Sequence, residues 1–213
     1  RLTVAKIVQI PGNYHTIRFS FQEYFEKLLD NPITWGKPTA ALLGAYRVQS
    51  ALKLASIGGK DSMSGSFEDL HVPPTLVSFA ITSGDVNDIM TPEIKETGHV
   101  LAEIIINKDQ YHIFDFNHLQ KQYDAIMELM KDKKIYSAYT VKDGGVIEAV
   151  SKMAFGNGVG VAFNNENSLE SYIVRDYGNI IIEVKSEKDL SIFDNYRIVG
   201  TTNDSELLSY GGE

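Results

Sequence analysis

The sequence predicts an α+β protein in which helices and strands are mixed. Apolar residues recur at helical spacing in several stretches, whereas other stretches are short apolar runs of the length of strands. The two kinds of stretch do not alternate strictly as β-α-β, which argues against a doubly wound parallel sheet. A chain of 213 residues with 43% hydrophobic and 23% charged residues is long enough to bury a core, in one large domain or two small ones.

The first half is expected to hold two helices and at least two strands. Residues 4–8 fit a strand or the end of a helix, and residues 16–19 fit a short strand. Apolar side chains at positions 21, 25, 28 and 29 have the spacing of one helical face, so a helix is expected there, ended by Asp30-Asn31-Pro32. The best helical pattern runs from 38 to 54, and a strand follows from 74 to 85. The buried stripe of this second helix is predicted to be Ala41, Leu42, Ala45, Val48 and Leu52.

The second half has a clearer pattern, and a domain boundary is expected before it, near Glu93–Gly98. Residues 100–106 form a nearly continuous apolar run, as in a strand covered on both faces. Two helices are predicted, at 117–131 and 146–155, with a strand at 135–141 between them. Late strands are expected at 180–184 and 197–200.

The stretch Ser56–Phe67 has an unusual composition for a connection between packed elements. Gly58, Gly59 and Gly65 let the backbone approach a ligand or adopt positive φ, and Lys60 offers a point charge suited to phosphate. Asp61 and the hydroxyls of Ser62, Ser64 and Ser66 add polar groups. These residue types suit a phosphate-binding loop. The simpler alternative is a surface turn, because the Walker spacing is absent.

The order of the residues in this stretch is more informative than the residue types alone. Gly59-Lys60-Asp61-Ser62-Met63-Ser64, followed by residues 72–80, resembles the phosphoribosylformylglycinamidine synthase family, in the second synthetase repeat of its large single-chain form. Residues 21–25 with 35–38 and the helix at 40–49 resemble the segment upstream of that loop. Asp143-Gly144-Gly145 followed by residues 148–155 resembles the family's D-G-G-helix motif.

The resemblance implies a fold, an activity and partners. The fold would be the end of an N-terminal synthetase-type α/β domain (1–94) followed by a C-terminal α+β domain like that of aminoimidazole ribonucleotide synthetase (95–213). The family makes formylglycinamidine ribonucleotide from formylglycinamide ribonucleotide, ATP and glutamine in purine biosynthesis, with ATP and Mg as cofactors. The partners would be the remaining synthetase repeat and the glutaminase domain of the same polypeptide.

The chain starts at Arg1 without Met, so we expect a piece of a longer protein that holds no cofactor tightly and has no turnover alone. By resemblance, Gly58, Gly59, Lys60, Asp61, Ser62 and Ser64 would line a cleft for substrate or phosphate. Lys60 would hold the phosphate. A homodimer of the fragment is possible, because the family's first domains pair through their sheets.

The motif Asp143-Gly144-Gly145 stands at a predicted strand-to-helix junction. Asp is a favoured N-cap, and the amides of a helix N-terminus attract anions, so either plain capping or an anion site fits. Relatives usually carry Asp and Ser where this chain has Thr140 and Lys142. A threonine hydroxyl is a poor Mg²⁺ ligand, so no metal site is expected there.

Other function classes fit less well. The net charge of −8 without a basic cluster argues against nucleic acid, and no apolar run approaches the ~20 residues of a membrane span. Without cysteine there are no disulfides or thiolate sites, which fits a cytoplasmic protein. The five histidines lack metal-ligand spacing, and only His71, beside the loop, invites attention.

Two alternatives remain open at this point. The chain could be a catalytically silent repeat that binds a structural nucleotide or only scaffolds its partner domains. It could also be another ATP-using enzyme of the superfamily, such as aminoimidazole ribonucleotide synthetase, selenophosphate synthetase or thiamine-phosphate kinase, which the string Gly59–Ser64 fits less well.

Overall fold

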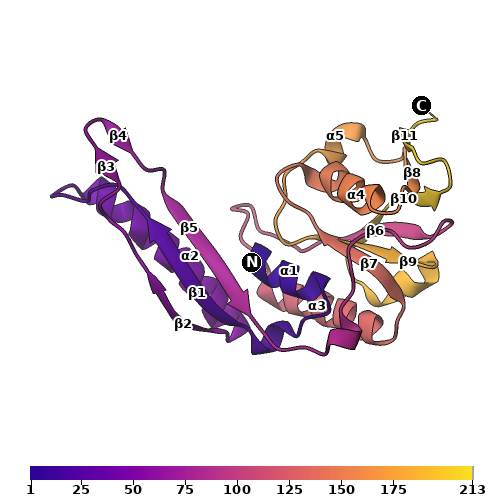
Figure 1. Cartoon of the computed structure of the whole chain (residues 1–213), viewed down its shortest axis with the longest axis horizontal. Coiled ribbons are helices and arrows are strands. Elements are labelled where there is room, and N and C mark those ends of the chain that lie inside the picture. Colours follow the sequence, from indigo (N-terminus) through magenta and orange to yellow (C-terminus); the bar gives the residue numbers. More distant parts are fainter. Residues whose placement is uncertain (213) are drawn as a thin grey trace. The chain divides into compact units, whose positions relative to one another are not determined.

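The computed structural model describes residues 1–212, which divide into two compact units (Figure 1). The smaller unit is Tyr14–Ser83, and the larger unit is Arg1–Asn13 together with the residues from Gly84 onward. These units are defined by packing alone. The expected division into domains 1–94 and 95–213 stays a prediction.

The smaller unit is built on a three-stranded sheet in the order β2-β1-β5. The central strand β1 (Arg18–Tyr24) pairs in parallel with β2 (Ala55–Lys60) and antiparallel with β5 (Thr75–Ile81). The 3₁₀ turn η1 (Tyr14–Thr16) precedes β1, helix α2 (Pro32–Leu52) follows it, and β3 (Ser66–Phe67) pairs with β4 (Leu70–His71) as a small hairpin.

The helix predicted from positions 21, 25, 28 and 29 is wrong. Residues up to Tyr24 are strand, and Tyr24 still pairs with Thr75 of β5. The aromatic spacing suits a helix, but strands on both sides of β1 satisfy its backbone groups, and this long-range pairing overrides the local pattern. Asp30-Asn31-Pro32 begins a helix rather than ending one: the Asn31 side chain accepts from the Ile33 N–H at 2.9 Å, with Pro32 at the first turn.

Helix α2 therefore starts six residues before the predicted Pro38, which lies inside it. Its expected stripe is only partly covered: Leu52 is buried and Ala41, Ala45 and Val48 are half-buried. Leu42 is 57% exposed, so its place in the stripe is wrong. The side chains of Leu43 and Tyr46 are exposed beside it. The helix thus leaves an apolar face without a partner in the described part of the chain.

The larger unit is built on a six-stranded sheet in the order β11-β8-β10-β6-β9-β7. Its strands are β6 (Val100–Ile104), β7 (Ile135–Thr140), β8 (Gly160–Phe163), β9 (Ile180–Val184), β10 (Tyr196–Asn203) and β11 (Leu208–Tyr210). Figure 1 shows α4 (Gly145–Phe155) on one side of this sheet and α1 (Leu2–Gln9) with α3 (Phe116–Lys131) on the other. The short elements are η2 (Val86–Asp88), α5 (Leu169–Tyr172) and η3 (Glu187–Ile192).

The predicted helices and strands of this unit are confirmed, with bounds shifted by one or a few residues. Residues 4–8 are helix, one of the two options left open. Leu119, Tyr123, Ile126 and Met130 of α3 are buried, and Val146, Ala149, Val150 and Met153 of α4 pack in the core. No helix among residues 1–212 combines the length and apolar character that a membrane span requires.

Candidate functional site

The predicted loop Ser56–Phe67 is not one long connection. Its first part is the parallel strand β2, which ends at Lys60 opposite Gln22 of β1. The following residues stay beside the β1 chain: the Ser62 N–H donates to Glu23 O at 2.9 Å, and Phe25 N–H donates to Ser62 O at 2.8 Å. The strand was missed because its Gly- and Ser-rich composition carries no β signal.

The backbone structure explains why β2 contains two glycines. Phe19 pairs with Ser56 but Ser20 pairs with Gly58, so Ile57 is the extra residue of a β-bulge, and Gly58 has a φ of +151°. A Cβ on Gly59 would lie 2.5 Å from the Phe21 carbonyl oxygen. These glycines shape the strand, whatever ligand role they also have.

The ammonium of Lys60 is the group best placed to meet an anion. All six residues of β2 are exposed, and Lys60 Nζ donates one hydrogen bond, at 3.0 Å, to the Asp61 carbonyl oxygen. It makes no ion pair in the part of the chain that the structure describes, so two of its protons are free. The neighbouring Asp61 carboxylate acts on the buried Glu23: burial first, and Asp61 second, raise the pKa of Glu23 above its ordinary value.

The loop amides are only partly available. Besides that of Ser62, the Gly65 N–H is used, donating to Phe25 O at 3.0 Å. The Met63 and Ser64 N–H groups have no such partner within residues 1–212. The hydroxyls of Ser62 and Ser64 likewise make no hydrogen bond among the described residues. One ammonium, two amides and two hydroxyls can therefore still face a ligand.

A polar cluster beside the loop involves His71, the histidine singled out from the sequence. Its Nδ1 lies 2.8 Å from Ser66 Oγ and 3.8 Å from Glu26 Oε2, and Glu26 is also ion-paired with Lys37. Both contacts use the same ring nitrogen, so Ser66, His71 and Glu26 do not have the geometry of a nucleophilic triad. The cluster ties the β3–β4 hairpin to the segment after β1. Sequence reasoning missed Glu26 and Lys37, which no local pattern connects to it.

The structure places Asp143-Gly144-Gly145 at the junction of β7 and α4, as predicted. Asp143 is not the N-cap, however; that residue is Gly144, whose N–H donates to Glu148 Oε2 at 2.8 Å. Glu148 is also ion-paired with Lys152, and the hydrogen bonds from Lys152 and Gly144 lower the pKa of Glu148. An anion approaching this helix start would meet the Glu148 carboxylate.

Gly145 is required by close packing. Its φ is +69°, and a Cβ there would lie 2.5 Å from the Tyr172 carbonyl oxygen. Asp143 instead faces the segment after α5: it accepts a hydrogen bond from the Tyr177 hydroxyl and lies 3.9 Å from Arg175. The bond to Asp143, with burial, raises the pKa of Tyr177.

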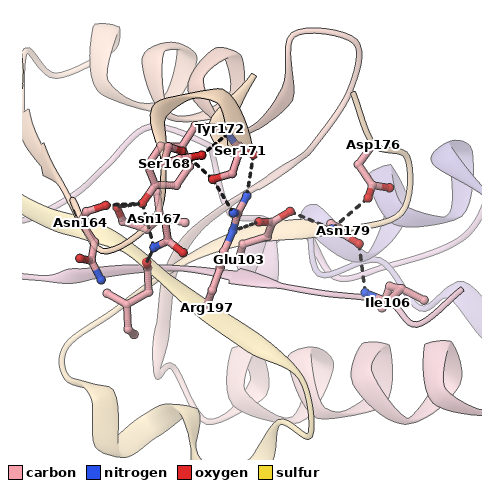
Figure 2. Close-up of polar contacts among 12 residues, drawn as sticks. Glu103, Ile106, Asn164, Asn167, Ser168, Ser171, Tyr172, Asp176, Asn179 and Arg197 are labelled. Atoms are coloured by element: carbon pink, nitrogen blue, oxygen red, sulfur yellow. Dashed lines mark hydrogen bonds and ion pairs between the residues drawn. The ribbon is translucent and has the colours of Figure 1, made fainter. Parts of the chain in front are cut away.

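The segment that contacts Asp143 is held by a buried polar network, drawn in Figure 2. Arg197 Nε donates to Glu103 Oε2 at 2.6 Å, and its other nitrogens donate to Ser171 Oγ at 3.0 Å and Ser171 O at 3.1 Å. Asn179 Nδ2 donates to Glu103 Oε1 at 2.7 Å. Because Glu103 is 3% exposed, these partners stabilise a carboxylate that burial would otherwise penalise.

The two departures from the family pattern have different surroundings. Thr140 is buried, and its Oγ1 has no hydrogen-bond partner among the described residues. Lys142 Nζ donates to the Tyr139 hydroxyl at 2.9 Å. Among residues 1–212 no three His, Asp or Glu side chains are grouped as a metal site requires.

No family model matches the chain. Among the curated proteins that do match are two named phosphoribosylformylglycinamidine synthase subunit PurL, and the probable membrane antigen 3 of Saimiriine herpesvirus 2, which is 23% identical over 164 residues. The protein from Picrophilus torridus is 35% identical over 106 residues, and that from Methanocaldococcus jannaschii is 28% identical over 157 residues. The resemblance to phosphoribosylformylglycinamidine synthase is confirmed. These matches cover 47% and 67% of this chain but only 14% and 21% of the two synthase subunits, so the chain spans a small part of their length.

Solved structures show the same fold. Thermotoga maritima PurL complexed with ADP superposes with a TM-score of 0.70 at 11% identity, over 97% of this chain and 36% of that one. Escherichia coli HypE, a hydrogenase maturation protein, gives a TM-score of 0.72 at 12% identity, over 99% and 76%. The mixed helix and strand architecture is thus shared with PurL and HypE.

Proposed function

We propose that this chain is part of the synthetase portion of phosphoribosylformylglycinamidine synthase, within the second repeat of a large single-chain form. The sequence similarity to two synthase subunits carries the proposal. The parent enzyme is an ATP-dependent C–N ligase of purine biosynthesis in the cytoplasm, a glutamine amidotransferase that converts formylglycinamide ribonucleotide to formylglycinamidine ribonucleotide.

The proposed chemistry assigns this chain a binding task. ATP activates the formamide oxygen as an iminophosphate, and ammonia then displaces phosphate; such steps need cations and fixed donors around developing charge. Lys60 supplies a cation at the end of β2, and the Met63 and Ser64 amides with the Ser62 and Ser64 hydroxyls supply donors. By the family resemblance, ATP and Mg are cofactors of the parent enzyme, and this chain alone is expected to hold neither tightly.

The partners proposed are the other synthetase repeat and the glutaminase domain. The smaller unit has apolar side chains exposed on α2 and on β5, among them Trp35, Leu43 and Phe79. Exposed apolar patches of this kind mark interaction surfaces. Alone, the chain is expected to dimerise through the same surfaces, which light scattering tests: a strictly monomeric mass at micromolar concentration contradicts this part of the proposal.

The isolated chain is expected to have no turnover. Incubation with ATP, formylglycinamide ribonucleotide and ammonium salts, followed by chromatographic detection of product, tests this directly. Formation of formylglycinamidine ribonucleotide above the rate without protein would overturn it.

A binding titration separates the ligand role from the alternative, a silent scaffold. ADP is titrated calorimetrically into the wild type, Lys60→Ala and Arg47→Ala. Arg47 is an exposed cation on α2 of the same unit and controls for net charge. The proposal predicts weak binding that falls about fivefold in Lys60→Ala only, since an exposed charge-assisted contact contributes about 1 kcal/mol. Equal, negligible binding by all three supports the scaffold.

A further inference from the structure

A cavity of about 580 Å³ lies in the larger unit, and it contains none of the residues assigned above. Its wall is formed by the C-terminal end of α3, the start of β7 and the segment around residues 87–95. β7 separates it from the Asp143 motif: Ile135 at the start of the strand lines the cavity, and Thr140 at the other end precedes the motif. The volume is in the range of small-molecule sites.

Part of the cavity lining, called the methionine floor below, is apolar and rich in sulfur. Met90, Met127 and Met130 line it together with Ile135. These are three of the five methionines of the chain. Thioethers are polarizable, adapt to irregular shapes and pack favourably against aromatic rings, so this floor suits a flat aromatic body.

Tyr136, a hydrogen-bond donor in the cavity lining, packs against a buried pair of polar side chains. The Tyr136 ring packs against His99, with centroids 4.4 Å apart. His99 Nδ1 in turn lies 2.8 Å from Oε1 of the fully buried Glu183. The Tyr136 hydroxyl has no hydrogen-bond partner among residues 1–212, so it is free to donate to a ligand.

Positive charge is in excess among the side chains that line the cavity. Lys131 and Lys133 line the cavity and make no ion pair in the described part of the chain, whereas Lys95 is paired with Glu93. Asp88 is the one carboxylate that lines the cavity among the described residues, so the charged side chains of its lining carry a net positive charge. Complementing the negative end of α3 accounts for lysines near its last turn. The helix dipole does not explain why two of these lysines line an apolar cavity together with an unpaired tyrosine hydroxyl.

We propose that this cavity binds a small aromatic anion, with its ring system on the methionine floor and its phosphate, sulfonate or carboxylate group between Lys131 and Lys133. The free Tyr136 hydroxyl donates to the same ligand. The site is independent of the synthase assignment, because it rests on residues of the larger unit that the proposed catalysis does not use.

The test uses 8-anilinonaphthalene-1-sulfonate as probe and the full chain labelled with ¹³C at the methionine methyls. N-phenyl-1-naphthylamine, which has the same rings without the sulfonate, is the matched uncharged probe. Met63 in the smaller unit and Met153, on the buried face of α4, are internal controls, since neither lines the cavity. Met153 also reports whether each variant is folded.

The sulfonate probe is expected to shift the Met90, Met127 and Met130 signals while Met63 and Met153 stay in place. The double variant Lys131→Glu/Lys133→Glu should weaken its affinity about tenfold and leave the uncharged probe unaffected, and Lys188→Glu, an exposed lysine elsewhere in the unit, should change neither. The proposal would be overturned if the signals of the three cavity methionines did not shift. It would also be overturned if the double variant bound the sulfonate probe as tightly as the wild type.

Discussion

At the scale of single residues, the glycines of the two motifs have structural tasks that can be separated from ligand binding. Gly59 and Gly145 each face a backbone carbonyl at a distance that excludes a Cβ. Lys60 has no such structural task, since its side chain is exposed and unpaired with any carboxylate in the described chain. The cation, and not the glycines, is therefore the residue whose substitution reports on function.

Gly145→Ala is predicted to destabilise the larger unit by about 2 kcal/mol or more, because the site combines a positive φ with a contact to the Tyr172 carbonyl. Urea unfolding followed by far-UV circular dichroism measures it. Gly84→Ala is the control, since no atom lies within 4 Å of its ideal Cβ. Similar, small losses in both variants would contradict the packing at the α4 start.

Glu23→Gln is predicted to stabilise the smaller unit at neutral pH. The pKa of Glu23 is raised in the folded state, so folding favours its protonated form, and this contribution to stability is lost as pH rises through the folded-state pKa. Unfolding in urea at several pH values between 4 and 8 should show a steeper decline for the wild type than for the variant.

Trp35, the one tryptophan of the chain, reports these transitions from within the smaller unit by its fluorescence. Glu68→Gln, on the β3–β4 hairpin, is the control and should follow the wild type. A variant curve parallel to the wild-type curve at every pH would show that Glu23 is not the group responsible.

At the scale of elements, the larger unit is stabilised by buried carboxylates as well as by its apolar core. Glu183 on β9 is fully buried and accepts from the Lys95 N–H at 2.9 Å, the Glu96 N–H at 3.1 Å and the Ser137 hydroxyl at 2.7 Å, besides its contact with His99. It thereby ties the chain entering β6 to the middle of the sheet.

Removing this carboxylate leaves several buried donors without a partner. Glu183→Ala is therefore predicted to cost about 3 kcal/mol or more in the free energy of unfolding. Glu187→Ala, an exposed acid of η3, should change it by less than about 0.5 kcal/mol. Chemical denaturation of both variants measures the difference, and equal stability of the two would contradict the role assigned to Glu183.

A helix or strand is predicted well when its sequence pattern is local, and poorly when its hydrogen-bond partners lie far along the chain. Helices α3 and α4 and strands β6 and β9 were predicted because their apolar patterns are local and strong. The helix placed over residues 21–29 failed because β1 is set by pairing with residues 55–60 and 75–81, far along the chain. β8 and β11 are short and carry no distinct pattern, and they were missed.

In the candidate site, too, the features that could be predicted are those whose residues are neighbours in the sequence. The junction at Asp143-Gly144-Gly145 could be located because its glycines and the following helix are contiguous. That Glu148, and not Asp143, meets the Gly144 N–H could not be predicted, because both assignments satisfy capping preferences. The cluster of Glu26, Lys37, Ser66 and His71 exists only once the fold brings three segments together.

At the scale of the whole molecule, the two units differ in the size of their cores. The buried apolar residues of the smaller unit are Tyr14, Ile17, Phe19, Phe25, Leu28, Leu52 and Leu54, whereas the larger unit buries residues from both faces of its sheet. A small core supports little stability, and such units usually need a partner. This agrees with the proposal that the chain is one part of a larger synthase.

The smaller unit is accordingly predicted to unfold first. Trp35 fluorescence should report a transition at lower urea than the main change in far-UV circular dichroism, to which both units contribute. Coincident transitions would indicate that the units unfold cooperatively.

A crystal structure of the chain grown with ADP tests the central claim most directly, namely that the lysine at the end of β2 meets a phosphorylated ligand. The predicted result is a phosphate oxygen within about 3 Å of Lys60 Nζ, at hydrogen-bonding distance. An ordered nucleotide bound elsewhere, with the turn after Lys60 packed against the protein's own core, would contradict the account.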